Sequence, residues 1–506
     1  MNTTIRNDID DNGGYDAGAH EGNCHRLRCR RICQVAASPG ALASVRVCAI
    51  MASMSTSTSK PLGRRHKRAT NNPDHARRTH VPAPPDRDME QRLNELVKPA
   101  VFAELAYYRQ LGMRSRLLNL PVMVALVLAL LWRRVPGVCT LQRMLGRERI
   151  LWTQPTRVSQ AALSERLLTF PAVLFERVLY RVLARLPARL AARTRPLSPV
   201  LQAVQPRFSG CYALDGTILE ALFRKLEALR EVAEAPFAGQ LAVVCDLATR
   251  LPAKLFYTDD PGANDKAVLP RLLAWLPCNS LLVFDLGFFA FTFFDDLTTV
   301  GSWFVTRLRE KTSFSVQQVL INRAQVRERI VKLGIYRSNR SSQEVRLIEV
   351  YIDGAWRHYV TNVLDPRQLS IVEVVELYDY RWRIETAFLL VKRLLDLAYL
   401  WVGSQNGVQL QIWATWLYYA VLIDLCDDVA ELLQLPLSRI SVEMVSRSLY
   451  FYVQAVDQGY SGDAASYLAR EAKDLGIVKR LRSPSGPTVT EQIRLALVGP
   501  PLPAGP

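Results

Sequence analysis

The sequence predicts an α/β fold: a mixed sheet flanked by helices, interrupted by an antiparallel β insertion, with helical regions before and after it. Three observations indicate this fold. Short apolar runs bounded by turn residues lie between residues 210 and 284 and are typical of buried strands. Alternating apolar and polar residues follow over 301–365, and helical periodicity fills 89–205 and 407–457.

The chain has 506 residues, a net charge of +17 and a pI of about 9.6. This length is enough for two or three domains with sizeable cores. The basic excess is not confined to one tail, so an anionic partner is one interpretation and solubility alone is the other. Nine cysteines without a CxxC pair predict reduced thiols in a cytosolic protein. The apolar stretch Leu117–Trp132 is short for a membrane span and predicts a buried helix.

Residues 1–88 lack periodicity and are rich in Ser, Thr, Pro, Arg and Asn, which predicts a disordered basic leader. An alternative is that translation starts later, at Met51, Met54 or Met89. Regular patterning begins near Met89.

Residues 89–205 predict an all-helical region with a strong basic bias. Between Arg133 and Arg195 there are 13 arginines and only three acidic residues. Arg177, Arg181, Arg185 and Arg189 recur every four residues and predict a basic stripe, although Pro187 interrupts it. The segment 158–168 resembles the second helix of a helix-turn-helix. A DNA-binding region and a helical bundle with an exposed basic face both remain open.

Between residues 206 and 300 the pattern changes to strands. The expected strands are 210–214, 241–245, 253–257 and 280–284, with a short helix at 268–276 whose first turn tolerates Pro270. We expect 206–300 and 366–435 to be two parts of one core, separated by the β insertion 301–365. Residues 436–506 predict a helical C-terminal region that ends in a frayed, Pro- and Gly-rich tail.

Several kinds of chemistry are excluded by residues that the chain lacks. Five of the six histidines lie in the first 80 residues, which leaves only His358 for the patterned part. A Ser-His-Asp or Cys-His mechanism is therefore not expected. HExxH, GxxxxGK[ST] and GxGxxG motifs are also absent from the sequence. Carboxylates with hard metal ions remain as the natural catalytic chemistry.

The segment 371–396 predicts a long helix with one chemically unusual face. Ser370 and Glu373 have the spacing of a capping box, and no Pro or Gly interrupts the run. Tyr378, Arg381, Glu385 and Lys392 fall within an arc of about 60° on such a helix. The alternative is the solvated face of an amphipathic helix. Leu377, Ile384, Phe388, Val391 and Leu395 supply its packed side.

Two aspartates complete a carboxylate series with Glu385. Asp215 and Asp285 each follow an apolar strand-like run and lie next to a glycine. Each aspartate alone could be a turn residue or a helix cap. If the three carboxylates lie close together, they would repel one another unless cations neutralised them. Two Mg²⁺ ions, for which Mn²⁺ can substitute, would do so and would hold a phosphodiester for attack by water or a 3′-hydroxyl. Arg381 and Lys392 would then hold neighbouring phosphates, and Tyr378 would donate a hydrogen bond to another.

With these residues the chain resembles the DDE transposases of bacterial insertion sequences, in the insertion-sequence-4 type with a Tyr-x2-Arg-x3-Glu-x6-Lys signature. Tyr378, Arg381, Glu385 and Lys392 match that spacing in full. YALDGT around Asp215, FDLGFF at 284–289, WFVTRL at 303–308 and YVTNVL at 359–364 are similar to the family's neighbouring segments. The resemblance covers about residues 150–460, and the leader 1–88 departs from it.

The resemblance implies an RNase H-like core with Asp215, Asp285 and Glu385 as catalytic and metal-binding residues. It implies Mg²⁺-dependent nicking of double-stranded DNA at terminal inverted repeats, followed by joining of the 3′-hydroxyl to target DNA. It also implies a homodimer in a synaptic complex, in the bacterial cytoplasm at the nucleoid. Trp382 matches an aromatic residue on which a flipped base stacks, and ordinary helix packing is its alternative.

Two other functions remain open. One is a nuclease of the same fold that hydrolyses DNA without strand transfer, and the full Tyr, Arg, Glu and Lys set favours the transposase over it. The other is a decayed or domesticated DNA-binding protein that no longer cuts. Inverted repeats flanking the gene would support mobility, and their absence would favour the non-cutting protein.

Overall fold

The structure of the protein is a computed structural model that defines residues 83–218, 239–260, 263–382, 387–388, 390–391, 404–480 and 486–500. Of the predicted leader, only residues 83–88 are described: 83–86 precede α1, and Arg87 and Asp88 belong to it, so the prediction of disorder is wrong there. All the elements below belong to one unit of the chain.

The elements from Arg87 to Val204 are helices. They are α1 (Arg87–Leu96), α2 (Lys98–Ala103), α3 (Leu105–Gln110), α4 (Leu120–Trp132), α5 (Val138–Leu145), α6 (Gln160–Thr169), α7 (Ala172–Leu183), α8 (Leu186–Ala191) and α9 (Pro199–Val204). Asp86, Asn119 and Ser159 cap α1, α4 and α6 by accepting hydrogen bonds from backbone N–H groups of the first turn. The prediction of a buried apolar helix is confirmed, because α4 is buried from Met123 to Trp132. No helix within the described ranges is long and apolar enough to cross a membrane.

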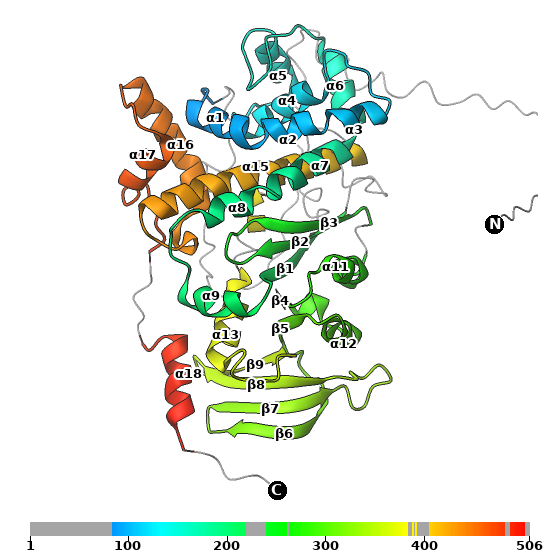
Figure 1. The fold of residues 1–506 in the computed structure, drawn as a ribbon, viewed down its shortest axis with the longest axis vertical. Helices are drawn as coiled ribbons and strands as arrows, with labels where there is room; N and C mark the ends of the chain where they lie inside the picture. Colours follow the sequence, from blue (N-terminus) through cyan, green and yellow to red (C-terminus); the bar gives the residue numbers. More distant parts are fainter. Residues whose placement is uncertain are drawn as a thin grey trace, which may run out of the picture. The chain divides into compact units, whose positions relative to one another are not determined.

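One mixed sheet of nine strands follows, in the order β3-β2-β1-β4-β5-β9-β8-β7-β6 (Figure 1). The strands are β1 (Gly210–Ile218), β2 (Gln240–Asp246), β3 (Pro252–Thr258), β4 (Ser280–Phe284), β5 (Trp303–Arg307), β6 (Phe314–Asn322), β7 (Val326–Leu333), β8 (Glu344–Ile352) and β9 (Ala355–Thr361). β1, β4 and β5 are parallel, and β2 and β3 extend the sheet by antiparallel pairing on the other side of β1. The mixed α/β prediction is confirmed.

The strand 303–307 differs from its prediction. The alternation of apolar residues grouped it with an antiparallel insertion, but β5 pairs parallel with β4 and only its other edge is antiparallel, to β9. β6 to β9 therefore continue the central sheet through β5 rather than forming a separate one. Alternation favours an antiparallel strand with one solvated face but does not determine strand direction.

The two faces of the sheet pack against different helices. Leu214, Leu282 and Phe284 contact a core that includes α11 (Leu269–Trp275) and α12 (Phe291–Thr299). Within this core the rings of Phe294 and Phe304 stack with their centroids 4.6 Å apart. Alternate residues of the same strands, such as Ala213 and Val283, face the other core, which includes α13 (Ile371–Tyr380) and α15 (Gln405–Leu432).

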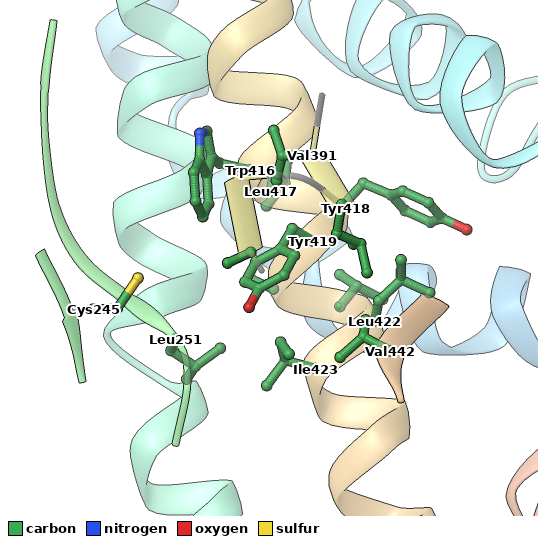
Figure 2. Close-up of a cluster of buried hydrophobic side chains, with 14 of the residues drawn as sticks. Cys245, Leu251, Val391, Trp416, Leu417, Tyr418, Tyr419, Leu422, Ile423 and Val442 are labelled. Atoms are coloured by element: carbon green, nitrogen blue, oxygen red, sulfur yellow. The ribbon is translucent and has the colours of Figure 1, made fainter. Parts of the chain in front are cut away.

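The centre of the second core is α15, a helix of 28 residues that runs beside α7. Figure 2 shows Trp416, Tyr419 and Ile423 of α15 together with Cys245 of β2 and with Leu251. Tyr419 is fully enclosed, and its hydroxyl donates a hydrogen bond of 3.2 Å to the Arg250 carbonyl. After α15 in the sequence come α16 (Val442–Asp457), α17 (Ala464–Arg470) and α18 (Val489–Val498).

The prediction of one uninterrupted helix over 371–396 is wrong at Arg381. The capping box is confirmed: Ser370 accepts from the Glu373 N–H, and Glu373 accepts from the Ser370 N–H. However, α13 ends at Tyr380, where the Arg381 N–H bonds the Tyr378 carbonyl three residues back. The rest of the predicted face, with Glu385 and Lys392, lies outside the described residues.

The predicted basic stripe is occupied by internal ion pairs. Arg177 and Arg181 both pair with the buried carboxylate of Glu104, and Arg189 pairs with Asp424 at 2.9 Å. Arg185 is exposed. Three of the four arginines are thus engaged with acidic residues that lie far away in the sequence, and the stripe is not a free basic face.

Asp424, on α15, is the centre of the larger of these ion networks. Its carboxylate is fully buried and pairs with Arg92 of α1, with Arg189 and with Arg193. Burial raises the pKa of Asp424, but the three guanidinium groups outweigh this effect, and the pKa is lowered. The ionised carboxylate therefore joins α1 and α8 to α15.

Replacing Asp424 by Ala should reduce the free energy of unfolding by about 3–5 kcal/mol, because buried guanidinium groups would lose their shared partner. Since the folded-state pKa is lowered, this stabilisation is present above the unfolded pKa and is lost as pH falls through the folded pKa. Urea unfolding at pH 7 measures it. Glu95→Gln is the control: it removes an exposed carboxylate 3.8 Å from Arg189 and should cost less than about 0.5 kcal/mol. Equal losses in both variants would contradict the network.

Candidate functional site

The parallel pairing of β1 with β4 brings Asp215 and Asp285 side by side. Leu214 pairs with Phe284, so the two aspartates occupy the next positions on neighbouring strands, which are about 4.8 Å apart. The backbone of Asp285 is extended (φ −89°, ψ −178°), so side chains still alternate between the two faces of the sheet at this position. Asp215 and Asp285 therefore lie on the same face as Ala213 and Val283, two residues earlier. The expectation that Asp215 follows the end of its strand is wrong, because β1 continues to Ile218. Asp215 is only 8% exposed.

Glycines fix the orientation of both carboxylates. Asp215 Oδ1 accepts a hydrogen bond of 3.1 Å from the Gly216 N–H, and Asp285 Oδ1 accepts one of 3.0 Å from the Gly287 N–H. The bond from Gly287 makes Asp285 the cap of a short 3₁₀ turn, Leu286–Phe288. Local bonds of this type limit the rotamers of the two side chains.

The end of α13 faces this pair. Arg381 is 5% exposed, and its Nη1 lies 3.7 Å from Asp215 Oδ1. Its guanidinium also lies 5.6 Å from the ring centroid of Tyr378, which is 6% exposed. The structure thus brings together four of the sequence-predicted residues, Asp215, Asp285, Tyr378 and Arg381. Burial raises the pKa of Tyr378, an effect that the neighbouring Arg381 and Arg307 partly offset.

Trp382 has a different environment. It is 57% exposed, and the Arg381 guanidinium lies 5.0 Å from its ring centroid. The exposed ring does not have the environment of a core tryptophan, and its role in base stacking stays a prediction.

Glu385 and Lys392 lie outside the described residues, so their predicted roles stay predictions. The described neighbours Ala387, Phe388, Leu390 and Val391 are helical and buried. The Phe388 ring lies 5.8 Å from that of Trp416 on α15. The packed side expected for Leu377, Phe388 and Val391 is therefore confirmed, whereas Ile384 and Leu395 are not described.

Sequence reasoning missed two charged residues at the site. Asp265 begins a 3₁₀ turn before α11, and partial burial, with the charge of the nearby Asp285 as a second cause, raises the pKa of Asp265. Arg307 ends β5 and acts electrostatically on Tyr378 and Tyr359. Arg307 lies within a segment that carried the family resemblance, which could have drawn attention to it. Nothing local distinguishes Asp265 from an ordinary acidic residue in the first turn of a helix.

Arginines also hold the N-terminus of α13. Arg207 donates hydrogen bonds of 3.0 Å to the Gln368 carbonyl and to Glu373, and the buried Arg346 donates to the Leu369 carbonyl. Burial raises the pKa of Glu373, but hydrogen bonds from Arg207 and Ser370 outweigh this effect, and the pKa is lowered. These contacts connect α13 to the segment before β1 and to β8, and so position Tyr378 and Arg381.

The donor set suits a hard divalent cation. Asp215 and Asp285 offer carboxylate oxygens on adjacent strands, which is the ligand type that Mg²⁺ prefers. Within the described ranges, no group of three or more His, Cys, Asp or Glu side chains could hold a metal ion. Glu385, the predicted third ligand, falls outside those ranges.

Residues 210–420 match the family model described as "Transposase DDE domain". The matched range contains Asp215, Asp285 and Glu385, and the match supports a transposase activity of the DDE class. No curated protein sequence matches the chain. Among solved structures, the chain is similar to the piggyBac transposase synaptic complex with hairpin DNA, with 11% identity and a TM-score of 0.31. That similarity covers 79% of this chain and 85% of the other, and its TM-score is too low to bear on fold or activity.

Replacing Arg381 by Gln should destabilise the metal-free protein by about 1–3 kcal/mol at pH 8, because two adjacent carboxylates would lose a nearly buried cation. The loss should be smaller in an Asp215→Asn background, which removes the carboxylate that Arg381 faces. Urea unfolding in both backgrounds in EDTA measures it.

Arg309→Gln is the matched control, because Arg309 is close to the site but donates to the Leu286 carbonyl and is exposed. It should cost less than about 1 kcal/mol in either background. An equal loss for Arg381→Gln in both backgrounds would mean that packing, rather than the charge pair with Asp215, accounts for it.

Proposed function

We propose that the protein is a DNA transposase that nicks transposon ends and joins the 3′-hydroxyl to target DNA by two-metal phosphoryl transfer. One observation carries this proposal. Asp215 and Asp285 lie side by side on parallel strands, opposite Arg381, within the range that matches the transposase DDE domain. Carboxylates next to a guanidinium provide both cation ligands and a phosphate-binding group.

In this proposal Asp215, Asp285 and Glu385 bind two Mg²⁺ ions, and Mn²⁺ can substitute. When bound, the ions would activate water or a 3′-hydroxyl and stabilise the departing oxygen. The oxygen-only donor set of Asp215 and Asp285 supports Mg²⁺ rather than a softer metal.

The surrounding side chains bind and orient the DNA backbone. Arg381 offers a planar guanidinium to a phosphate, Tyr378 offers a hydroxyl, and Lys392 contributes a point charge. Trp382, exposed beside Arg381, provides a face on which a displaced base stacks. Arg307 joins the phosphate-binding set because it lies on the Tyr378 side of the site.

The strand order supports an RNase H-like core. β3-β2-β1-β4-β5, with β1, β4 and β5 parallel and β2 antiparallel, is the order of that fold. We propose that 206–300 and 366–435 form this core, with 301–365 inserted and 436–506 as the C-terminal region.

We propose that residues 89–205 bind the transposon end through the turn between α5 and α6. Gln142 of α5 donates to the Val158 carbonyl just before α6, which fixes the two helices relative to each other. Arg143, Arg147 and Arg157 are exposed along this turn. The connection between α5 and α6 spans residues 146–159, which is longer than the turn of roughly 3–4 residues in a helix-turn-helix. The proposal therefore rests on these exposed arginines, since three of the four arginines of the stripe on α7 and α8 are paired.

We also propose a homodimer in a synaptic complex, in the bacterial cytoplasm at the nucleoid. The resemblance to insertion-sequence transposases supports both. Double-stranded DNA, as terminal inverted repeats and as target, is the proposed partner.

The test uses the purified full chain and a labelled duplex that carries the DNA end flanking the gene. We expect Mg²⁺-dependent nicking at the element boundary, abolished by EDTA. Asp285→Ala and Glu385→Gln should each lower cleavage by about 100-fold or more while end binding persists, because they remove metal ligands rather than DNA contacts. Gel analysis of nicked and joined products gives both measurements.

Asp296→Asn, which removes an exposed carboxylate from α12, is the control and should cut normally. Nicking without a joined product would identify a nuclease. Binding without cutting in Mg²⁺ or Mn²⁺ would identify a decayed or domesticated DNA-binding protein. Persistent cutting by Glu385→Gln would show that the assignment of Glu385 as a metal ligand is wrong.

A further inference from the structure

A cavity of about 750 Å³ lies at the outer edge of the sheet, where β3 forms one wall and α7, α11 and α15 form the others. Leu255 of β3 pairs with Val243, which pairs with Asp215, so the cavity is separated from the carboxylate site by β2. Cavities of this size hold small organic ligands. The side chains on which the argument depends are Glu176, Lys254, Arg271, Trp275, Gln409 and Trp413.

The backbone of β3 at this cavity is already hydrogen-bonded. The Tyr180 hydroxyl accepts a hydrogen bond of 3.1 Å from the Leu255 N–H and lies 3.4 Å from the carbonyl oxygen of the same residue, to which it donates. Arg271 donates to the Tyr257 carbonyl at 3.3 Å and to the Thr258 hydroxyl at 3.0 Å. These contacts block the edge against an added peptide strand. The binding capacity of the cavity therefore belongs to its side chains.

Three polar side chains of the cavity keep unused hydrogen-bonding capacity. Across the described ranges, no hydrogen bond or close ion pair engages the Glu176 carboxylate, the Lys254 ammonium group or the Gln409 amide. The Lys254 ammonium lies 4.5 Å from the ring centroid of Tyr180, which holds it at the cavity wall. Burial raises the pKa of Glu176, and Lys254 partly offsets this effect. A half-buried carboxylate in this position is stabilised by a ligand that donates a hydrogen bond to it.

The remaining walls suit a planar, anionic ligand. Trp275 and Trp413 supply aromatic rings, and the Trp275 ring is held by an edge contact with Tyr212 at 5.6 Å between centroids. Nucleobases stack on such rings. Lys254 and the exposed guanidinium of Arg271 supply positive charge for a phosphate group.

Glu176 and Gln409 complete the set, because both side chains accept hydrogen bonds from an exocyclic amino group. Adenine carries such a group, whereas thymine carries a carbonyl oxygen and a methyl group instead. The cavity thus combines a stacking surface, a cationic side and hydrogen-bond acceptors.

We propose that this cavity binds a nucleotide, with its phosphate at Lys254 and Arg271 and an amino group of its base at Glu176 and Gln409. The base stacks on the tryptophan rings. This site is separate from the carboxylates, so the inference goes beyond the proposed function and does not depend on it. A free nucleotide and a nucleotide within a DNA strand both carry the required groups.

The test measures binding of radiolabelled deoxyadenosine and thymidine monophosphates to the full chain by equilibrium dialysis, in EDTA so that no metal ion bridges the phosphate. Deoxyadenosine monophosphate should bind about tenfold more tightly, the worth of one hydrogen bond to a charged group. Lys254→Met should weaken binding of both nucleotides about tenfold, because it removes a charged partner of the phosphate. Glu176→Ala should abolish the preference for adenine. Lys332→Met removes the same charge from an exposed position on β7 and should change neither affinity.

Circular dichroism establishes that each variant is folded; if one of the two cavity variants unfolds, the other carries the test. Wild-type affinities and preference in the folded cavity variants would overturn the proposal, as would absence of nucleotide binding by the wild-type protein at millimolar concentrations. Binding that is lost in Asp285→Ala but kept in Lys254→Met would place the nucleotide at the carboxylate site and would also overturn it.

A competition experiment distinguishes the two sources of the nucleotide. If a single-stranded adenine oligonucleotide displaces deoxyadenosine monophosphate from the wild-type protein, and Lys254→Met weakens both, the site holds a nucleotide of a DNA strand. If the oligonucleotide and the monophosphate bind simultaneously, the site holds a free nucleotide. Both outcomes support the cavity as a nucleotide site.

Discussion

The parallel register between β1 and β4 is the constraint on which the site depends. Ala213 pairs with Val283 and Leu214 with Phe284, so the two aspartates that follow are neighbours on one face. A slip of one residue in either strand would turn its aspartate to the opposite face, into the core that contains Phe284 and Phe294. That core cannot accept a carboxylate, so the buried phenylalanines disfavour a shifted register between β1 and β4. Hydrophobic packing on one side of the sheet thereby determines the placement of the polar groups on the other.

The position of α13 is determined in the same way, by contacts at both ends and along its length. Arg207 and Arg346 bind the carbonyl groups just before Ser370, and α18 packs along the helix, where Thr490 donates to Glu376. Arg346 is fully buried on β8, beside Glu328 of β7. Because this buried guanidinium is held by a carboxylate and a carbonyl group, it permits few alternative positions of the N-terminus of α13. The extended part of the sheet, β6 to β9, thus contributes to the site by fixing the helix that ends at Arg381.

The features that could be predicted from the sequence are those with a local signal. The strand runs, the capping box of Ser370 and Glu373, the buried α4 and the aspartate after β4 each follow from residues within a few positions of one another. The arginines of α7 and α8 show the limit of such reasoning. Their spacing is local, but their partners Glu104 and Asp424 come from distant elements, so their engagement could not be foreseen. Asp265 was missed for the same reason, since only the folded sheet brings it to Asp285. The end of α13 at Tyr380 has no local signal, since no Pro or Gly lies near it.

Arg381 links the stability of the site to its proposed use. With no cation bound, its guanidinium is the positive charge that faces Asp215, at a distance of 3.7 Å, which is longer than a tight bidentate pair. Tyr378 and Trp382 flank the group, with ring centroids 5.6 and 5.0 Å from it. If cations bind to the carboxylates, Asp215 no longer needs this counter-charge, and the guanidinium becomes available to a phosphate. In the proposed function the guanidinium would exchange Asp215 for a phosphate, an exchange that a buried bidentate pair would oppose.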